Sequence, residues 1–328
     1  MTMKELARIA DVSSAAVSRY LNGGSLSQEK RERIREAIEK TGYQPDAVAQ
    51  MLRTGTTDHV GLIVPNISSD SVSRVTAGAT RVLSEEGYLC LLANTDNDPE
   101  KELAYLGLFE NRSVAGVILM ATVLTPRHEE MLKNAPFPIV VAGQQFRQVP
   151  CVYHDDFGAA HDLTERVIAK GRRNIGYIGV IEQDVAAGLN RRRGVQAAMK
   201  DHGLDPSALV VVNSPFNVEG GRAAMAKLLE EMPQVDGVVC ATDLIAFGAM
   251  EVLRQSGRWM PENVSVTGIG DSWAGEYIAP HLTTAHFYYE QSGETAARLL
   301  LDIMAKKGAP GPIHQTMLGY TIVERDSI

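Results

Sequence analysis

The sequence lacks the features that mark membrane, secreted and metal-binding proteins. No run of about 18 apolar residues occurs that could cross a bilayer, and the start, MTMKELARIADV, has no apolar core of signal-peptide length. The three cysteines, Cys90, Cys151 and Cys240, lie in apolar runs at spacings that match no metal motif. We therefore expect a cytoplasmic protein without membrane contact, with buried reduced thiols and with no metal or other cofactor.

The common signatures of enzymes are also missing. The chain has no G-x-x-x-x-G-K-[ST], no G-x-S-x-G and no H-E-x-x-H, and GIGD (268–271) lacks the third glycine of a dinucleotide loop. The triplet His154, Asp155 and Asp156 suggests a metal or acid–base cluster, but adjacent residues at a strand end point in alternating directions. We therefore expect that the protein is not an enzyme.

Length and charge indicate more than one domain and a polyanionic partner. A chain of 328 residues, 45% of them hydrophobic, can form two domains or more with a sizeable core. The net charge of −8 is uneven, because residues 1–55 carry nine Lys or Arg against seven acids, a net of +2, and the remainder carries −10. A slightly basic head on an acidic body suits a polyanion that contacts the head only.

Residues 1–44 have the pattern of three short helices. Thr2 and Glu5 have the spacing of a capping box, which opens the first helix. A tight turn at Asp11 follows, and Ser13 can then cap a second helix whose apolar positions fall on one side.

Ser27 can cap the third helix, and Gly42 stands where a C-terminal glycine belongs. A helix, a tight turn and a second helix rich in small polar residues describe a unit that reads DNA in the major groove. The pattern alone fits a small helical capping domain equally well.

The composition changes after Pro45. DAVAQMLRTGTTD (46–58) is a short, marginally helical piece followed by a Thr/Gly stretch, which is typical of a hinge and linker. We therefore expect a helical domain at 1–44, a hinge helix and linker at 45–57, and a core at 58–328.

In the core, short apolar runs alternate with longer amphipathic segments. Continuous hydrophobicity within the runs predicts parallel strands covered on both faces. Roughly ten strands are many for one sheet, so we expect two doubly wound lobes with a ligand cleft at the carboxyl ends of the strands. The runs are 59–65, 88–94, 116–121, 138–143, 174–180, 208–214, 237–243 and 265–270.

The segment ARIADVSSAAVSRYLN (7–22) resembles the helix-turn-helix signature of the lac and galactose repressor family. SQEKRERIREAIEKTGYQPDAVAQMLRTG (27–55) resembles its third helix and hinge, and the likeness continues in KGRRNIGYIGV (170–180), CATDLIAFGAM (240–250) and PHLTTAHF (280–287). It covers nearly the whole chain. It implies an N-terminal all-α helix-turn-helix domain and an α/β core of two doubly wound parallel-sheet lobes, similar to periplasmic binding proteins.

This resemblance implies a set of DNA contacts. Arg19 would form two hydrogen bonds to a guanine, worth roughly 1 to 3 kcal/mol of discrimination, while Ser14 and Ala15 would face base edges. Leu52 would be wedged between base pairs in the minor groove, although a plain apolar residue of a linker helix is the alternative. The implied DNA-binding residues are Ser13, Ser14, Ala15, Ser18, Arg19, Asn22, Tyr43, Ala49 and Leu52.

The resemblance also implies an effector site between the lobes. An aromatic face with an Arg, carboxamides and hydroxyls suits a polyhydroxylated ligand. For Phe216 and Trp273 plain packing is the alternative. The implied effector-binding residues are Asn66, Ser71, Val72, Gly143, Gln144, Arg191, Phe216, Thr242, Asp243, Asp271, Trp273 and Phe287.

At the turn before the second helix, Asp11 stands where the family commonly has Gly, and three positions of the core also depart from the family pattern. Gly143 replaces a common Asp, Thr242 replaces an Asn, and Gly270 stands at an acidic position. The segments VYHDDFGAA (152–160) and CATD (240–243) look most like sucrose- and trehalose-type repressors. Because a phosphate favours a cluster of basic side chains, and only Arg191 and Arg74 are candidates here, a neutral mono- or disaccharide is the expected effector.

We therefore predict a repressor of a carbohydrate-utilisation operon that binds pseudo-palindromic double-stranded DNA as a homodimer. A sugar in the cleft would set the lobe angle and thereby control DNA binding. One alternative is the same fold controlled by a protein corepressor or a sugar phosphate. Another is a sugar-binding protein without regulatory DNA contact. Because the chain ends after ERDSI without leucine heptads, we expect no tetramer built by such a tail.

Overall fold

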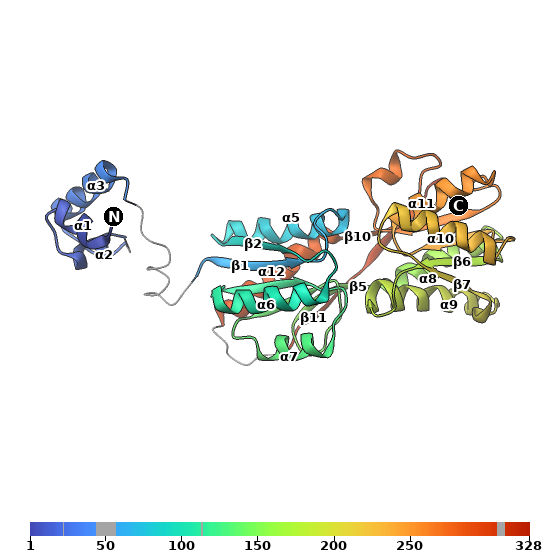
Figure 1. Ribbon diagram of the computed structural model, residues 1–328, viewed down its shortest axis with the longest axis horizontal. Coiled ribbons are helices and arrows are strands. Elements are labelled where there is room, and N and C mark those ends of the chain that lie inside the picture. Colours follow the sequence, from blue (N-terminus) through green and yellow to red (C-terminus); the bar gives the residue numbers. More distant parts are fainter. Residues whose placement is uncertain (22, 44–56, 113, 307–311) are drawn as a thin grey trace. The chain divides into compact units, whose positions relative to one another are not determined.

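The computed structural model describes residues 1–21, 23–43, 57–112, 114–306 and 312–328. It divides into two compact units, Met1–Thr57 and Asp58–Ile328 (Figure 1). Asn22 and residues 44–56, which include Ala49 and Leu52 of the predicted hinge, lie outside the described residues. No described helix has the length and apolarity needed to cross a membrane.

Residues 1–43 of the first unit, as far as the structure describes them, contain three helices, as predicted. The capping box is confirmed, because Thr2 Oγ1 accepts from the backbone N–H of Glu5 and Glu5 Oε2 accepts from that of Thr2. Ser13 Oγ accepts from the backbone N–H of Ala16 at 3.2 Å, which confirms the second cap. The helices are α1 (Met3–Ile9), α2 (Ser14–Leu21) and α3 (Gln28–Thr41).

The third cap differs from the prediction. Ser27 occupies the N-cap position of α3, but its side chain makes no capping hydrogen bond. Gly42 does end the helix with a left-handed φ of 63°. Asp11 also has a positive φ, 50°, and its carboxylate lies 3.3 Å from the guanidinium of Arg33, which ties the turn to α3.

The second unit is built on two six-stranded sheets, each belonging to one lobe. The first runs β11-β5-β4-β3-β1-β2 and the second β12-β10-β9-β8-β6-β7. Every pairing is parallel except that of β10 with β12. The strands are β1 (His59–Val64), β2 (Leu89–Asn94), β3 (Gly116–Met120), β4 (Ile139–Ala142), β5 (Cys151–His154), β6 (Ile175–Gly179), β7 (Val210–Asn213), β8 (Gly237–Cys240), β9 (Ser265–Ile269), β10 (Thr283–Phe287), β11 (Gln315–Leu318) and β12 (Tyr320–Val323).

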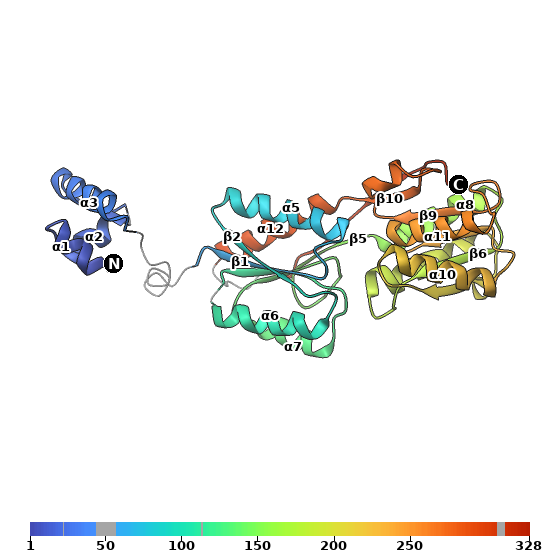
Figure 2. The ribbon, with the colours of Figure 1, turned by 45° about the horizontal axis from the view of Figure 1, so that its top comes forward.

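Helices cover both faces of each sheet, which confirms the doubly wound prediction (Figures 1 and 2). In the first lobe α5 pairs with α12 on one face and α6 with α7 on the other; in the second, α8 pairs with α9 and α10 with α11. The helices are α5 (Asp70–Glu85), α6 (Pro99–Arg112), α7 (Pro126–Asn134), α8 (Asp156–Ala169), α9 (Arg191–Asp201), α10 (Val218–Glu231), α11 (Asp243–Gln255) and α12 (Tyr289–Ala305), with the short helices η1 (Val185–Asn190), η2 (Pro206–Ala208) and η3 (Trp273–Glu276).

The chain passes between the lobes three times, after β5, after β10 and between β11 and β12. Register places the crossings side by side, since Leu318 pairs with His154 and Tyr320 with Phe287. The rings of His154 and Phe287 stack with centroids 4.6 Å apart. The predicted apolar runs do not include β5, β10, β11 or β12, although the triplet 154–156 was placed at a strand end, because these short strands carry Thr, His, Tyr or Gln.

One strand is less covered than predicted. Strand β2 is the edge of its sheet and leaves Leu89, Leu91 and Leu92 exposed, so the prediction of cover on both faces is wrong there. Cys90 is accordingly only half-buried, whereas Cys151 and Cys240 are fully buried. All three thiols are free, and burial raises their pKa values.

Candidate functional site

The outer face of α2 offers small side chains and one long one. Ala16 and Val17 point into the core of the first unit, as predicted, where they join the fully buried Leu6 and Ile34. Ser13, Ala15 and Arg19 are exposed, and Ser14 and Ser18 are half-buried. Such a face lets the helix backbone approach a partner closely, with Arg19 as its longest probe. Tyr43 is buried in the same core, where its ring packs beside α3.

The second unit contains a cavity of about 300 Å³ between the two lobes. It is lined by residues that follow the carboxyl ends of strands in both sheets, where a parallel α/β fold places its ligands. Nine of the predicted effector positions line it, namely Asn66, Ser71, Val72, Gly143, Gln144, Arg191, Phe216, Thr242 and Asp243.

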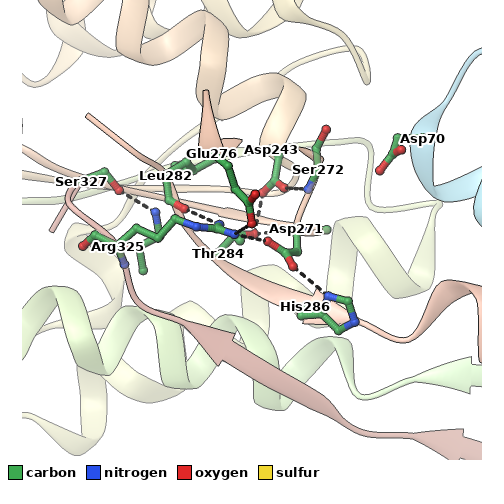
Figure 3. A network of polar contacts seen from close by, with 12 residues as sticks. Asp70, Asp243, Asp271, Ser272, Glu276, Leu282, Thr284, His286, Arg325 and Ser327 are labelled. Atoms are coloured by element: carbon green, nitrogen blue, oxygen red, sulfur yellow. Dashed lines mark hydrogen bonds and ion pairs between the residues drawn. The ribbon is translucent and has the colours of Figure 1, made fainter. Parts of the chain in front are cut away.

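Three predicted positions do not line this cavity. The Asp271 carboxylate is bound by Arg325 Nη2 and His286 Nδ1 at 2.7 and 2.8 Å, so its oxygens are held within the second lobe (Figure 3). Trp273 is 70% exposed on η3, beside Tyr277. Phe287 is fully buried at a crossing, beneath other side chains.

Arg191 lies at the base of the cavity with its charge already paired. Its Nε and Nη2 each lie 2.7 Å from Asp156 Oδ1, and its Nη1 donates to the carbonyl oxygen of Ala241. The guanidinium also lies over the Phe287 ring, 5.3 Å from the centroid. Both ionic side chains are buried, so each needs the other to offset its loss of hydration.

Gln144 joins the two lobes across the cavity. Its Nε2 donates to the carbonyl of Thr122 in its own lobe at 3.0 Å and to Asp184 Oδ1 in the other lobe at 2.7 Å. Its Oε1 accepts from the backbone N–H of Ala186 at 3.1 Å. Both ends of the carboxamide are therefore bound to the second lobe, which holds the lobes together in this structure.

Arg74 makes a second connection between the lobes. From α5 it donates to the carbonyl oxygens of Gly270 and Asp271 at 3.2 and 3.4 Å. It also lies 3.6 Å from Asp70, and 5.3 Å from the centroid of the Tyr289 ring. Its charge is therefore balanced beside the cavity and not directed into it.

Asp243 begins α11 and faces a set of donors within its own lobe (Figure 3). Oδ1 accepts from the Thr284 hydroxyl and Oδ2 from the backbone N–H of Ser272, each at 2.6 Å. Burial raises the pKa of this carboxyl to about 6, although both hydrogen bonds act to lower it. These contacts hold the Asp243 side chain in a fixed position in the cavity wall.

Several cavity residues were not predicted, chiefly Asp156, Asp184, His154, Asn97 and Tyr289. Asp155 and Asp156 do point differently, as expected: Asp155 Oδ1 accepts from the Gly158 N–H and caps α8, while Asp156 binds Arg191. His154 ends β5 and Asp156 follows it, and β5 was not among the predicted apolar runs. Asp184 is the N-cap of η1, and its position depends on how that turn packs. The one sequence signal that could have indicated it is its place shortly after the predicted strand 174–180.

Among the described residues one group, His161, Asp162 and Glu165 on α8, brings ligand atoms close enough for a metal ion. Each already has an internal partner. His161 Nε2 lies 3.1 Å from Asp201, Tyr320 donates to Asp162 at 2.7 Å, and Glu165 lies 3.1 Å from His202 Nε2. These contacts tie α8 to α9 and to β12.

Comparisons with known proteins agree with both units. Residues 2–46 match the model of bacterial regulatory proteins of the lacI family, and residues 164–328 match a periplasmic binding protein-like domain. The chain is 31% identical to the transcriptional regulator RegA of Clostridium saccharobutylicum over 99% of this chain and 98% of RegA. It is 29% identical to the sucrose operon repressor of Staphylococcus xylosus, over 89% of this chain and 90% of that repressor.

Solved structures show the same fold. The complex of the transcriptional regulator CelR with cellobiose is 30% identical, matches 100% of this chain and 99% of CelR, and has a TM-score of 0.76. Two matching domain models in the expected order, and a relative above 30% identity along nearly the whole chain, leave one assignment. The chain belongs to the LacI family of bacterial regulatory proteins.

Proposed function

We propose that this protein is a transcriptional repressor of a carbohydrate-utilisation operon, which binds operator DNA through α2 and a small sugar in the interlobe cavity. One observation carries the proposal. The same chain has a helix that exposes small side chains and a cavity between two lobes that Gln144 connects. Relatives named for sucrose and for a cellobiose complex support a sugar effector. Because the proposed partner is operator DNA, we expect the protein to be in the cytoplasm.

On the DNA side, Arg19 reads a base, and Ser14 and Ala15 let the helix lie close to base edges. Ser13, Ser18 and Asn22 position the unit against the DNA backbone, and Tyr43 braces the third helix near it. Ala49 and Leu52, the proposed wedge, act in the minor groove.

The operator is pseudo-palindromic and the protein is a homodimer, because a short hinge helix is marginal unless two hinges pair on DNA. The exposed leucines of β2 provide an apolar surface that a second copy can cover.

Coupling between the sites follows from the three crossings. Because the described backbone passes between the lobes in these adjacent segments, the lobes can change their angle without breaking a sheet. A sugar that contacts both lobes favours one angle, and in a dimer that angle sets the spacing of the hinges. The sugar shifts the equilibrium only by its different affinity for the two arrangements.

The cavity favours a sugar without phosphate. Both candidate cations are already paired, Arg191 with Asp156 and Arg74 with Asp70 and two carbonyls. A phosphate group would have to displace these partners, whereas hydroxyl groups can bind to Asn66, Ser71 and Thr242 around them. This argues against control by a sugar phosphate. Control by a corepressor protein would instead require that protein to raise DNA affinity when no sugar is present.

The test measures operator binding and sugar binding on the same protein. A thermal-shift series of unmodified sugars and their phosphates should raise the melting temperature for one unmodified sugar, because ligand binding stabilises the folded state. That sugar should then change the affinity for a palindromic site selected from random DNA. Selection of no DNA site, or a sugar that binds without changing DNA affinity, would contradict the proposal.

A further inference from the structure

The cavity wall beside Arg191 has more acceptors than donors. Asp156 Oδ1 accepts from Arg191, and Asp184 Oδ1 accepts from Gln144 and the Ala187 N–H. The backbone N–H of Ala186 also acts on the Asp184 carboxyl. The Oδ2 atom of each carboxylate has no hydrogen-bond partner among the described residues, and both side chains line the cavity. A carboxylate oxygen can only accept, so a ligand that fills this wall must bring donors.

His154 lines the same cavity and adds no positive charge to it. Burial, helped by the positive charge of Arg191, lowers the pKa of His154 to about 3, so the ring is neutral near pH 7. Its backbone hydrogen bond is to Tyr288, while Nε2 is buried and has no partner in the described part of the chain. In this tautomer Nδ1 carries the proton and Nε2 is an acceptor.

The charges of the wall do not balance either. Asp156 is matched by Arg191, and Asp70 by Arg74. Asp243 has both oxygens occupied by donors. Asp184 has no ion pair of its own among the described residues: burial raises the pKa of its carboxyl, while the positive charge of Arg191, which is paired with Asp156, acts to lower it.

The Asp184 carboxyl also acts on its neighbour. Burial raises the pKa of Asp156, and the charge of Asp184 adds to that rise, so the two groups repel each other. A buried carboxylate is costly without a counter-charge, and a ligand that supplies one removes the cost.

We propose that this wall is a cation-preferring subsite and that the effector carries a protonated amino group, as an amino sugar does, bound by the free oxygens of Asp184 and Asp156. This rests on the proposed function, since it names the chemical class of the effector for the same cavity. An ammonium group brings hydrogen-bond donors and one positive charge, which match the two free carboxylate oxygens and the carboxyl group of Asp184 that has no ion pair of its own. A hydroxyl supplies one donor and no charge.

The experiment compares matched ligands by calorimetry on the full-length protein. Glucose, galactose and mannose are each paired with the 2-amino sugar and with the N-acetyl derivative, which keeps the nitrogen but removes its charge. For at least one of the three sugars, the amino form should bind at least about tenfold more tightly than the parent sugar and the N-acetyl derivative. A tenfold ratio of affinities corresponds to about 1.4 kcal/mol, which one paired charge can supply. The preference should shrink as sodium chloride is raised.

Two variants locate the charge. Asp184→Asn keeps the shape of the side chain and should reduce the preference for the amino sugar to about threefold or less. Asp302→Asn, an exposed acid of α12 away from the cavity, should leave it unchanged. A thermal melt shows whether each variant is folded, and the comparison of ligands on the unaltered protein stands without them.

The outcomes separate the two proposals. Equal or tighter binding of the uncharged sugars, or of a sugar phosphate, overturns the cation-preferring subsite while leaving sugar control in place. If Asp302→Asn loses the preference for the amino sugar as Asp184→Asn does, the subsite is not located at Asp184. If no ligand of any class binds, sugar control itself fails and the subsite fails with it.

Discussion

Replacing Gln144 by Ala should open the cleft of the ligand-free protein. The substitution removes the hydrogen bond of 2.7 Å to Asp184 Oδ1 and the bond of 3.1 Å from the Ala186 N–H, both between lobes. A hydrogen bond to a charged acceptor contributes about 1.5 to 3 kcal/mol and a neutral one about 1 kcal/mol. The bond to Thr122 lies within one lobe and does not affect the balance.

The expected loss is therefore about 3 kcal/mol of preference for the closed arrangement, or about two orders of magnitude in the equilibrium between closed and open lobes. Small-angle X-ray scattering of the ligand-free protein measures this directly, because an open core has a larger radius of gyration. Gln144→Glu should open the cleft further, since a second carboxylate would face Asp184.

The neighbouring Gln145 offers a matched control. It is exposed one residue further along the chain, and Gln145→Ala should leave the scattering unchanged. If Gln144→Ala gives the same scattering curve as the unaltered protein, while both remain folded, the carboxamide does not hold the lobes together. Because ligand is absent, any direct contact of Gln144 with the effector does not enter this comparison.

Three further predictions concern the two sites. Arg19→Ala should relax selectivity at one operator position in a randomised-site binding assay, while the exposed Arg8→Ala of α1 should not. Phe216→Ala should weaken sugar binding by about tenfold and leave operator affinity unchanged, whereas Phe157→Ala, exposed but away from the cavity lining, should alter neither. Because Asp243 keeps its proton in the folded state up to a pKa of about 6, against 3.8 as its ordinary value, the free energy of unfolding should fall by up to about 3 kcal/mol between about pH 4 and 6. Urea unfolding across this range should show that slope in the unaltered protein and not in Asp243→Asn.

The local features of the first unit could be read directly from the sequence. The Thr2–Glu5 capping box, the Ser13 cap and the left-handed Gly42 depend on residues a few positions apart, so spacing alone specifies them. Ser27 shows the limit of such reasoning. A serine at an N-cap position need not form the hydrogen bond, because its rotamer depends on what surrounds it.

The architecture of the core followed from the apolar runs, but its edges and crossings did not. Strand β2 has the same composition as a buried strand, and only the strand order shows that it ends its sheet. Strand β5 pairs with β11, and β10 with β12, across more than 30 residues of sequence, so a distant partner supplies a regularity that their own sequence lacks.

For the cavity, the sequence alone predicted a cleft between two lobes. Through family resemblance it also predicted nine positions that line this cleft. Only the tertiary structure decided what those side chains are free to do. It pairs Arg191 with Asp156, ties Gln144 to Asp184, and turns Asp271 toward Arg325. The reason is physical: the charge available to a ligand is what remains after partners distant in sequence have been satisfied, and that remainder exists only once the chain is folded.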